Sequence, residues 1–286
     1  MSKAYRHCSY LAGLLDGEGN IGVYRSKNAK GYWGYAVNLN VANMDRRLMR
    51  YLVQQFGGVF QKKPTGFIWE PNGGKDRIQE ILNSVFPYLV MKRQQAELVL
   101  GFIGLGRAIC PESRERFYKR TLELNQTGVG KQSPLPHNTK TDFAYLAAIL
   151  DGEGHLRITK TKQYSWTGVC YHKSITVPNC NKSLMRYLQR HFGGVYKPCT
   201  RNNPNPNHSL SYVWSLFGNK LQEDLLLAAL PYMIIKKQQA TNILSMIRLN
   251  GAINPKERER LWKATIALNF RHSPQRLIRQ PVHITD

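Results

Sequence analysis

The segment Tyr10–Gly19, YLAGLLDGEG, recurs with only two substitutions as Tyr145–Gly154, YLAAILDGEG. Both copies are rich in apolar residues and predict helices. Small residues occupy the middle of each copy, at Ala12-Gly13 and at Ala147-Ala148. Such residues let two helices pack with their backbones unusually close. The motif therefore predicts two paired helices whose C-terminal ends lie side by side.

The repeat continues outward from this motif along most of the chain. The spacing between repeated blocks grows slightly, as insertions in loops would produce, and two copies indicate a pseudo-twofold molecule. We expect an N-terminal repeat at 1–125, a linker at 126–141 rich in glycine and proline, and a C-terminal repeat at 142–286. The repeated blocks are Leu48–Leu52 with Leu184–Leu188, Phe56–Val59 with Phe192–Val195, Lys92–Ala96 with Lys236–Ala240, and Pro111–Asn125 with Pro255–Asn269.

Each repeat has the hydrophobic pattern of a mixed α and β unit. Period-two alternation predicts strands, and an amphipathic pattern ended by Gly57-Gly58 predicts a helix with a left-handed C-cap. We therefore expect an α+β fold of two αββαββα repeats, each with an antiparallel sheet, packed through the two motif helices. In the first repeat the expected helices are Tyr5–Asp16 and Asp45–Phe56, the expected strands are Asn20–Asn28, Tyr32–Val41, Val59–Lys63 and Gly66–Glu70, and two or three helices follow.

The charge of the chain indicates a polyanionic partner. Lys and Arg number 41 against 18 Asp and Glu, which gives a formal net charge of +23. Such an excess, spread over periodic segments, is typical of nucleic-acid-binding proteins. The five cysteines form no C-x-x-C pair and suit a reducing compartment. The N-terminus shows no signal core, and no apolar run suggests a membrane span.

The paired motif ends predict a metal centre. Glu18 and Glu153 would lie near the pseudo-twofold axis. Two neighbouring carboxylates are costly without cations, and oxygen-rich sites of this kind select Mg²⁺. Metal ions there could activate water and stabilise the leaving 3′ oxygen of a phosphodiester.

The segments Leu11–Gly19 and Leu146–Gly154 resemble the LAGLIDADG signature, and the resemblance covers nearly the whole chain. It implies a single-chain, two-repeat homing endonuclease that works as a monomer. The implied reaction is a metal-dependent double-strand break, made by phosphodiester hydrolysis at a long, asymmetric DNA target in intron homing. The implied cofactor is Mg²⁺, as two or three ions, with Mn²⁺ or Ca²⁺ able to replace it in binding. The implied location is intracellular, in a chloroplast, a mitochondrion or a prokaryotic cytoplasm.

The resemblance also implies roles for individual residues. The family's metal-binding acid matches Glu18 and Glu153, although many members carry Asp there, and a backbone carbonyl helps at Gly17 and Gly152. Lysines matching Lys92 and Lys236 stabilise charge and order solvent near the scissile phosphates. Further pocket positions match Arg47, Asn43 and Asn179. Relatives often carry Gln at the two Asn positions, and Ser183 aligns with Arg47, so the two strands are expected to be cut at unequal rates.

The polar faces of the predicted strands are candidates for reading DNA. Their side chains can exchange hydrogen bonds with base edges, and a β-ribbon fits the major groove. The two faces differ in sequence, so a palindromic target is not expected. Candidate DNA-binding residues are Tyr24, Ser26, Asn28, Asn38, Asn40, Lys62, Lys63, Arg157, Thr159, Thr161, Ser174, Thr176, Lys197 and Arg201, of which the lysines and Arg201 extend the surface or grip phosphates.

Two other functions fit parts of the pattern. An intron maturase, which binds RNA, shares the fold and the charge, and retention of both glutamates and both lysines favours the nuclease over it. A non-catalytic DNA-binding regulator has little need of paired carboxylates beside phosphates. The ends of the sequence show no self-splicing segments that would indicate an intein-resident enzyme.

Overall fold

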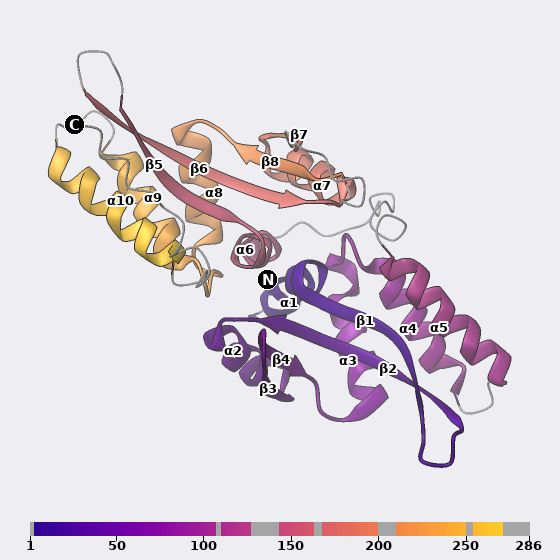
Figure 1. Cartoon of the computed structure of the whole chain (residues 1–286). Helices are drawn as coiled ribbons and strands as arrows, with labels where there is room; N and C mark the ends of the chain where they lie inside the picture. The colour runs from indigo at the N-terminus through magenta and orange to yellow at the C-terminus, as the bar shows by residue number, and fades with distance from the viewer. Residues whose placement is uncertain are drawn as a thin grey trace, which may run out of the picture.

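The computed structural model describes residues 3–106, 110–126, 143–162, 168–199, 210–249 and 254–270. The described residues form two halves with the same order of α-helices and strands, one on each side of a central pair of helices (Figure 1). The first half contains α1 (Lys3–Glu18), β1 (Gly19–Lys27), β2 (Trp33–Asn43), α2 (Arg46–Phe56), β3 (Val59–Lys63), β4 (Gly66–Glu70), α3 (Gly74–Val85), the 3-10 helix η1 (Phe86–Tyr88), α4 (Arg93–Gly104) and α5 (Pro111–Asn125).

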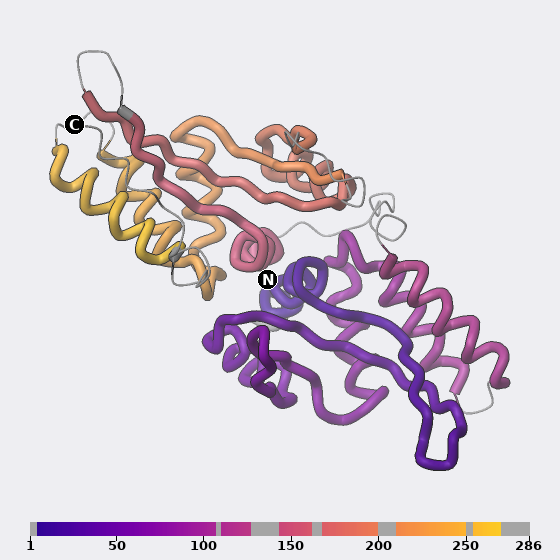
Figure 2. The backbone as a smooth tube through the Cα atoms, viewed as in Figure 1, coloured from indigo at the N-terminus to yellow at the C-terminus, as the bar shows by residue number. Residues whose placement is uncertain are grey.

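The second half repeats this order on the other side of the central helices, as the backbone trace shows (Figure 2). It contains α6 (Phe143–Gly152), β5 (His155–Lys162), β6 (Val169–Asn179), α7 (Lys182–Phe192), β7 (Val195–Pro198), β8 (Tyr212–Leu216), α8 (Asn219–Ala229), α9 (Lys237–Arg248) and α10 (Pro255–Phe270).

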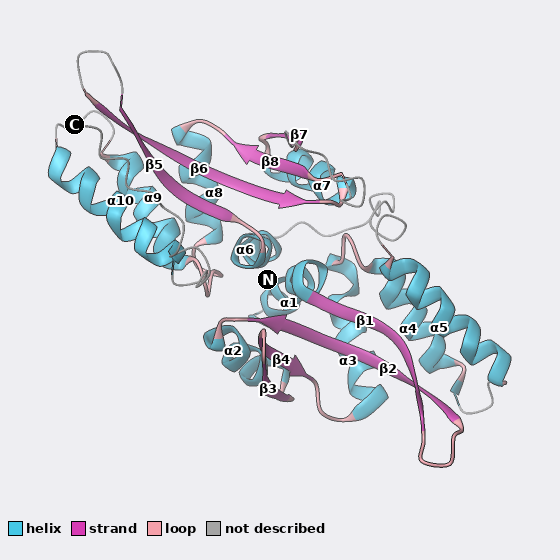
Figure 3. Cartoon of the chain, viewed as in Figure 1, coloured by secondary structure: helices cyan, strands magenta, loops and turns pink. Residues whose placement is uncertain are grey.

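Each half has one four-stranded antiparallel sheet (Figure 3). The strand orders are β1-β2-β4-β3 and β5-β6-β8-β7, so the two sheets have the same topology. The predicted α+β fold of two αββαββα repeats is confirmed. The motif helix is longer than expected, because α1 runs through Gly17 to Glu18 and not only to Asp16. The first strand ends at Lys27, which places Asn28 in the hairpin turn.

The two motif helices α1 and α6 form the centre of the molecule. Residues on both are fully buried, and a Cβ atom added to Gly13 would lie 2.6 Å from the Tyr145 carbonyl oxygen. Two reciprocal hydrogen bonds join the halves, from Tyr10 Oη to Asp151 and from Tyr145 Oη to Asp16, each 2.8 Å long. The predicted close packing of the motif helices is therefore present.

The aspartates of the motif also hold the chain that follows each sheet. Asp16 accepts hydrogen bonds from the backbone N–H groups of Val90 and Lys92, at 2.7 and 2.8 Å. Asp151 accepts the corresponding bonds from Ile234 and Lys236. These contacts fix the starts of α4 and α9 to the C-terminal end of the motif helix in the same half, in keeping with a structural role for both carboxyl groups.

The amphipathic helix α2 begins and ends as its sequence predicts. The Asp45 side chain accepts a hydrogen bond from the Arg47 backbone N–H at the N-cap. Gly57 and Gly58 have φ values of 69° and 86°, which favour glycine. The Trp69 indole donates to the Gly57 carbonyl at 2.8 Å, and this contact ties the helix end to β4.

Most of the expected linker, at 127–141, lies outside the described residues, so its boundaries stay a prediction. Within the described ranges, no helix has the length and apolar character needed to cross a membrane.

Candidate active site at the ends of the motif helices

The C-terminal ends of the two motif helices bring Glu18 and Glu153 together. A Cβ atom added to Gly17 would lie 3.5 Å from Glu153 Oε1, and one added to Gly152 would lie 3.6 Å from Glu18 Oε1. Each carboxylate therefore lies over the glycine of the opposite motif. Burial raises the pKa of Glu18, while the ammonium groups of Lys236 and Lys92 act in the other direction. The two glutamates therefore lie close together at the ends of the motif helices, as the sequence predicts.

Immediately after each glutamate, a glycine turns the chain from the helix into the first strand. A Cβ atom on Gly19 would lie 2.6 Å from Leu15 Cα, and one on Gly154 would lie 2.7 Å from Leu150 Cα. A side chain cannot be accommodated at either point. The last glycine of each motif is therefore what lets β1 and β5 start directly beside the carboxylates.

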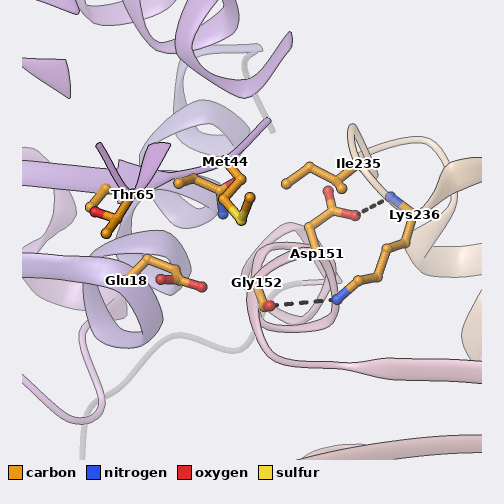
Figure 4. Close-up of a pocket in the computed structure, with 9 residues that line it drawn as sticks. Glu18, Met44, Thr65, Asp151, Gly152, Ile235 and Lys236 are labelled. Atoms are coloured by element: carbon orange, nitrogen blue, oxygen red, sulfur yellow. Dashed lines mark hydrogen bonds between the residues drawn. The ribbon is translucent and has the colours of Figure 1, made fainter. Parts of the chain in front are cut away.

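A pocket of about 370 Å³ surrounds Glu18. Asn43, Met44 and Thr65 line it from the first half, and Gly152 and Lys236 line it from the second half (Figure 4). Figure 4 shows Glu18 on α1 facing Gly152, with Lys236 on the far side of the pocket. This pocket is therefore composed of residues from both halves.

A second pocket of about 360 Å³ surrounds Glu153 and has the mirrored composition. It combines Glu153 and Asn179 of the second half with Gly17 and Lys92 of the first. Each pocket thus pairs the glutamate and asparagine of one repeat with the lysine of the other. The sequence placed these residue types at one centre but did not show which lysine accompanies which glutamate.

The two lysines hold the ends of the motif helices. Lys92 Nζ donates to the backbone carbonyls of Leu15, Asp16 and Gly19 at 2.6–2.9 Å. Lys236 Nζ donates to Leu150 and Gly154 at 2.9 and 2.6 Å and reaches the Gly152 carbonyl at 3.5 Å. Burial lowers the pKa of Lys236 to about 8, against the pull of Asp151, Glu18 and Glu153. Both cations therefore lie at the negative ends of helix dipoles, beside the carboxylates.

The two pockets differ in their hydrogen bonds. Asn179 donates through Nδ2 to Glu153 Oε2, while its Oδ1 accepts from the Asn181 backbone. Asn43 Oδ1 accepts the equivalent bond from the Asp45 backbone at 2.8 Å, but no bond from Asn43 to Glu18 is formed in the described part of the chain. The hydrogen bonding at the centre is therefore asymmetric.

Arg47 lies beside the pocket around Glu18 and not in its lining. Its guanidinium binds the Asp45 carboxylate, with the shortest distance 2.6 Å, and reaches the Ile235 carbonyl of the second half at 3.3 Å. In the second half, the aligned Ser183 is buried and Asn181 replaces Asp45 at the N-cap. Arg47 therefore makes a bridging contact between the halves that the sequence did not predict.

The polar faces of the sheets carry most of the candidate DNA-binding residues. The strand pairs Gly22–Asn38 and Asn20–Asn40 place both β2 asparagines on one face, away from the buried Leu39. In the second sheet, Arg157 pairs with Ser174 on the face opposite the buried Ile175. The following candidates lie at exposed or half-buried positions of the strands: Tyr24, Ser26, Asn38, Asn40, Lys63, Arg157, Thr159, Thr161, Ser174, Thr176 and Lys197.

Three candidates have other positions. Asn28 lies in the β1–β2 turn, where its Oδ1 accepts from the backbone N–H groups of Lys30 and Tyr32 at 3.0 Å. Lys62 pairs with Phe67 and lies two residues after Phe60, so all three share the helix-covered face of the sheet. Lys62 can therefore approach DNA only from the sheet edge. Arg201 lies outside the described residues.

The structure also adds residues that sequence reasoning missed. Gln61 shares the polar face with Lys63 and accepts its hydrogen bond, and His172 bonds Thr161 across the second hairpin. Met44, Thr65 and Cys180 line the pockets. Strand alternation could have placed Gln61 and His172, whereas the pocket residues follow strand ends, where alternation carries no information.

The donor set at the centre suits a hard divalent cation. Glu18, Glu153 and the carbonyl oxygens of Gly17 and Gly152 supply only oxygen, which Mg²⁺ and Ca²⁺ prefer. Among the described residues, no group of three or more His, Cys, Asp or Glu side chains gathers at one point. A cation here would take its remaining ligands from water or phosphate, as Mg²⁺ commonly does at sites with one or two carboxylates.

Comparison with known proteins establishes the class of fold. No family model matches the sequence, and no curated protein matches it. Among solved structures, the I-SmaMI LAGLIDADG homing endonuclease bound to cleaved DNA is 16% identical, with a TM-score of 0.69 over 94% of this chain and 98% of that chain. The I-LtrWI LAGLIDADG homing endonuclease bound to target DNA is 13% identical, with a TM-score of 0.67 over 92% and 97%. I-SmaMI bound to an uncleaved DNA target in the presence of calcium ions is 15% identical, with a TM-score of 0.66 over 92% and 98%.

These similarities extend over both repeats and nearly the full length of each neighbour. The chain therefore has the two-repeat LAGLIDADG fold of homing endonucleases. Within that fold, this chain carries the motif pair LAGLLDGEG and LAAILDGEG, and the ends of the two motifs form the asymmetric centre.

Proposed function

We propose that this chain is a site-specific DNA endonuclease of the homing type, which makes a metal-dependent double-strand break at a long, asymmetric target. The observation that carries this proposal is the pair of composite pockets, each with a glutamate, an asparagine and the other repeat's lysine. Two pockets related by a pseudo-twofold axis match the two strands of a duplex, whose backbones are also related by twofold symmetry.

The residues of each pocket have distinct roles in phosphodiester hydrolysis. Glu18, Glu153 and the carbonyls of Gly17 and Gly152 would hold divalent cations, which when bound lower the pKa of water and stabilise negative charge. Lys92 and Lys236 fix the helix ends and add positive charge where the phosphate would lie. Their position is set by three carbonyl contacts each, so this charge is in place before DNA binds.

Duplex DNA is the partner that suits the two sheets. Their polar faces carry Asn, Thr, Arg and Lys side chains that can bind base edges and phosphates. The faces differ in sequence, which favours an asymmetric target. DNA in the I-SmaMI and I-LtrWI structures, and calcium ions in one of them, support the same ligand and a divalent cation. Both glutamates come from one chain, which supports action as a monomer.

The test is cleavage of a randomised duplex library with Mg²⁺ or with EDTA. We expect the wild type to cut one long, asymmetric site in Mg²⁺ alone, and Glu18→Gln and Glu153→Gln to bind that site without double-strand cleavage. Glu97→Gln, which removes an exposed carboxylate on α4, is the matched control and should cut normally.

Two outcomes would contradict this proposal. Equal cutting by Glu18→Gln and the wild type would remove the metal-ligand role of that carboxylate. No cutting by the wild type, together with tight binding of structured RNA, would favour a maturase.

A further inference from the structure

The outer part of each first hairpin is a ribbon of only two strands. Strand β2 pairs with β4 only at Val41–Asn43, so among the described strands its residues before Val41 have only β1 as a neighbour. In the second half, β6 pairs with β8 only at Ile175–Asn179. An isolated two-stranded hairpin is marginally stable in water, so these ribbons need support from elsewhere.

In the first half, a carboxylate on α5 supplies that support. Arg25 and Tyr35 lie opposite each other on β1 and β2. Glu115 accepts two hydrogen bonds from Arg25 Nη1, at 2.8 and 2.9 Å, and one from Tyr35 Oη at 2.6 Å. We call Arg25, Tyr35 and Glu115 the N-terminal anchor. Its single carboxylate joins both strands of the ribbon to the helix.

The second half builds the same arrangement from different residues. Lys160 and Tyr171 lie opposite each other on β5 and β6. Glu259 on α10 accepts from Lys160 Nζ at 2.8 Å and from Tyr171 Oη through the same oxygen. Lys160, Tyr171 and Glu259 are the C-terminal anchor. The cation has changed from Arg to Lys, yet the cation, tyrosine and glutamate keep their places.

Aromatic rings hold the cation of each anchor in place. The Arg25 guanidinium lies 4.4 Å from the Trp33 ring centroid and 4.7 Å from that of Tyr118. Lys160 Nζ lies 4.9 Å from the Trp262 ring centroid. The carboxylates are about one quarter exposed, at 25% for Glu115 and 28% for Glu259. Partial burial and aromatic contact distinguish these pairs from ordinary surface ion pairs, which contribute little.

Each anchor lies next to the side chains that the proposed function assigns to DNA. Tyr24 and Ser26 flank Arg25, and Thr159 and Thr161 flank Lys160. Successive side chains of a strand point to opposite faces. An anchor that fixes one face of the ribbon therefore fixes the position of the reading side chains on the other face.

We propose that Glu115 and Glu259 are positioning residues, each of which sets the recognition of the outer base pairs of one half of the target. The inference rests on the proposed endonuclease function and deepens it. The carboxylates act through the ribbon and do not touch DNA. Each therefore controls discrimination on its own side of the target, while bond cleavage at the centre is independent of both.

The experiment combines two measurements on the full chain, with Glu115→Gln and Glu259→Gln. The first is amide hydrogen exchange in the free protein. We expect Glu115→Gln to speed exchange about tenfold in residues 24–27 and 33–36, because charge-assisted hydrogen bonds are lost, and to leave 159–161 and 169–172 unchanged. Glu259→Gln should give the opposite pattern.

The second measurement is binding to target duplexes that carry one substituted base pair each. We expect Glu115→Gln to lose discrimination only at the outer base pairs bound by the first sheet, and Glu259→Gln only at those bound by the second. The single-turnover cleavage rate with saturating DNA should stay at the wild-type value in both.

Matched controls remove the same charge from the same helices. Glu123→Gln on α5 and Glu257→Gln on α10 break only i,i+3 surface pairs, with Arg120 and Arg260, and should resemble the wild type.

The outcomes separate this inference from the proposed function. Unchanged exchange in both glutamine variants would overturn the anchors, whatever the protein binds. Faster exchange with equal loss of discrimination over both halves of the target, or a slower saturated cleavage rate, would overturn the positioning role. A wild type that binds no duplex would refute the endonuclease function, while the exchange data would still decide whether the anchors order the ribbons.

Discussion

A single missing methyl group sets the distance between the motif helices. A Cβ atom on Gly13 would lie 2.6 Å from the Tyr145 carbonyl oxygen and 2.7 Å from Ala148 Cβ. Both neighbours belong to a buried helix that cannot move without disturbing the core. We expect Gly13→Ala to lower the free energy of unfolding by about 1–3 kcal/mol, the usual cost of overpacking. Urea denaturation followed by circular dichroism measures this difference.

Gly101→Ala is the control for the glycine-to-alanine change itself. Gly101 lies inside α4, and the nearest atom to an added Cβ would be Phe117 Cε1 at 3.6 Å, an ordinary contact. Alanine is the better helix former, so Gly101→Ala should raise stability by up to about 1 kcal/mol. Equal stability of the Gly13→Ala and Gly101→Ala proteins would show that the motif helices are not in close contact.

Some of these residue contacts could be predicted from the sequence and others could not. Small residues at Gly13 and Ala148 identify the close approach because steric fit depends on residue size alone. The reciprocal bonds of Tyr10 with Asp151 and of Tyr145 with Asp16 were not predicted. A hydrogen bond depends on side-chain direction across the helix pair, and the sequence of one helix does not fix its rotation against the other.

At the scale of elements, the anchors give each hairpin a defined pH dependence. The hydrogen bond from Tyr35 and the contacts with Arg25 hold the pKa of Glu115 below its ordinary value. A carboxyl group with a lowered folded-state pKa stabilises the fold fully above its unfolded pKa, about 4.3 for Glu. That contribution is lost as the pH falls through the lower folded-state value.

We therefore expect the Glu115 side-chain carboxyl to titrate below pH 4.3 or so in a ¹³C NMR titration of the folded protein. In Tyr35→Phe the midpoint should move upward, because the first cause of the lowered pKa is removed. A Glu115 midpoint at or above about 4.3, the ordinary value for Glu, would contradict the anchor geometry.

The packing of α5 on β1 differs from the packing of α10 on β5, although the two halves are repeats in sequence. Thr121 Oγ1 accepts from the Val23 backbone at 3.0 Å, and a Cβ atom on Gly22 would lie 2.4 Å from Thr121 Cγ2. At the position aligned with Gly22, the second half has Arg157. There Thr265 donates to the Leu261 carbonyl within α10, as Thr121 donates to the Phe117 carbonyl within α5, and a pocket of about 820 Å³ lies beside β5. Element types were predictable from periodicity, whereas the bond from Val23 to Thr121 was not, because this close approach depends on the missing side chain of Gly22.

At the scale of the whole molecule, duplication within one chain makes the candidate centre possible. Each pocket takes its glutamate from one repeat and its lysine from the other, so neither repeat holds a complete pocket. The sequence predicted the repeats, the sheets and the glutamates at the axis because the blocks recur in register. It did not predict that each glutamate shares a pocket with the lysine of the other repeat, because this pairing depends on the angle at which the two halves meet.

The net charge of +23 gives the last prediction, a strong dependence of DNA affinity on salt. Each phosphate neutralised by a cation contributes about −0.9 to the slope of log affinity against log salt concentration. Lys63 and Lys197 are exposed on the polar faces of the two sheets. We expect Lys63→Gln and Lys197→Gln each to reduce the steepness of the slope by about one and to weaken binding to all sequences alike.

Lys220 provides the control for this measurement, because it is 81% exposed on α8 and pairs with Asp224. Lys220→Gln removes the same charge from the helical side of the second half and should leave the slope unchanged. If all three variants changed the slope equally, the salt dependence of DNA binding would depend only on the total charge of the protein. A change in slope confined to Lys63→Gln and Lys197→Gln would assign phosphate contacts to the polar faces of the sheets. The same duplex would then contact the anchored ribbons and the composite pockets.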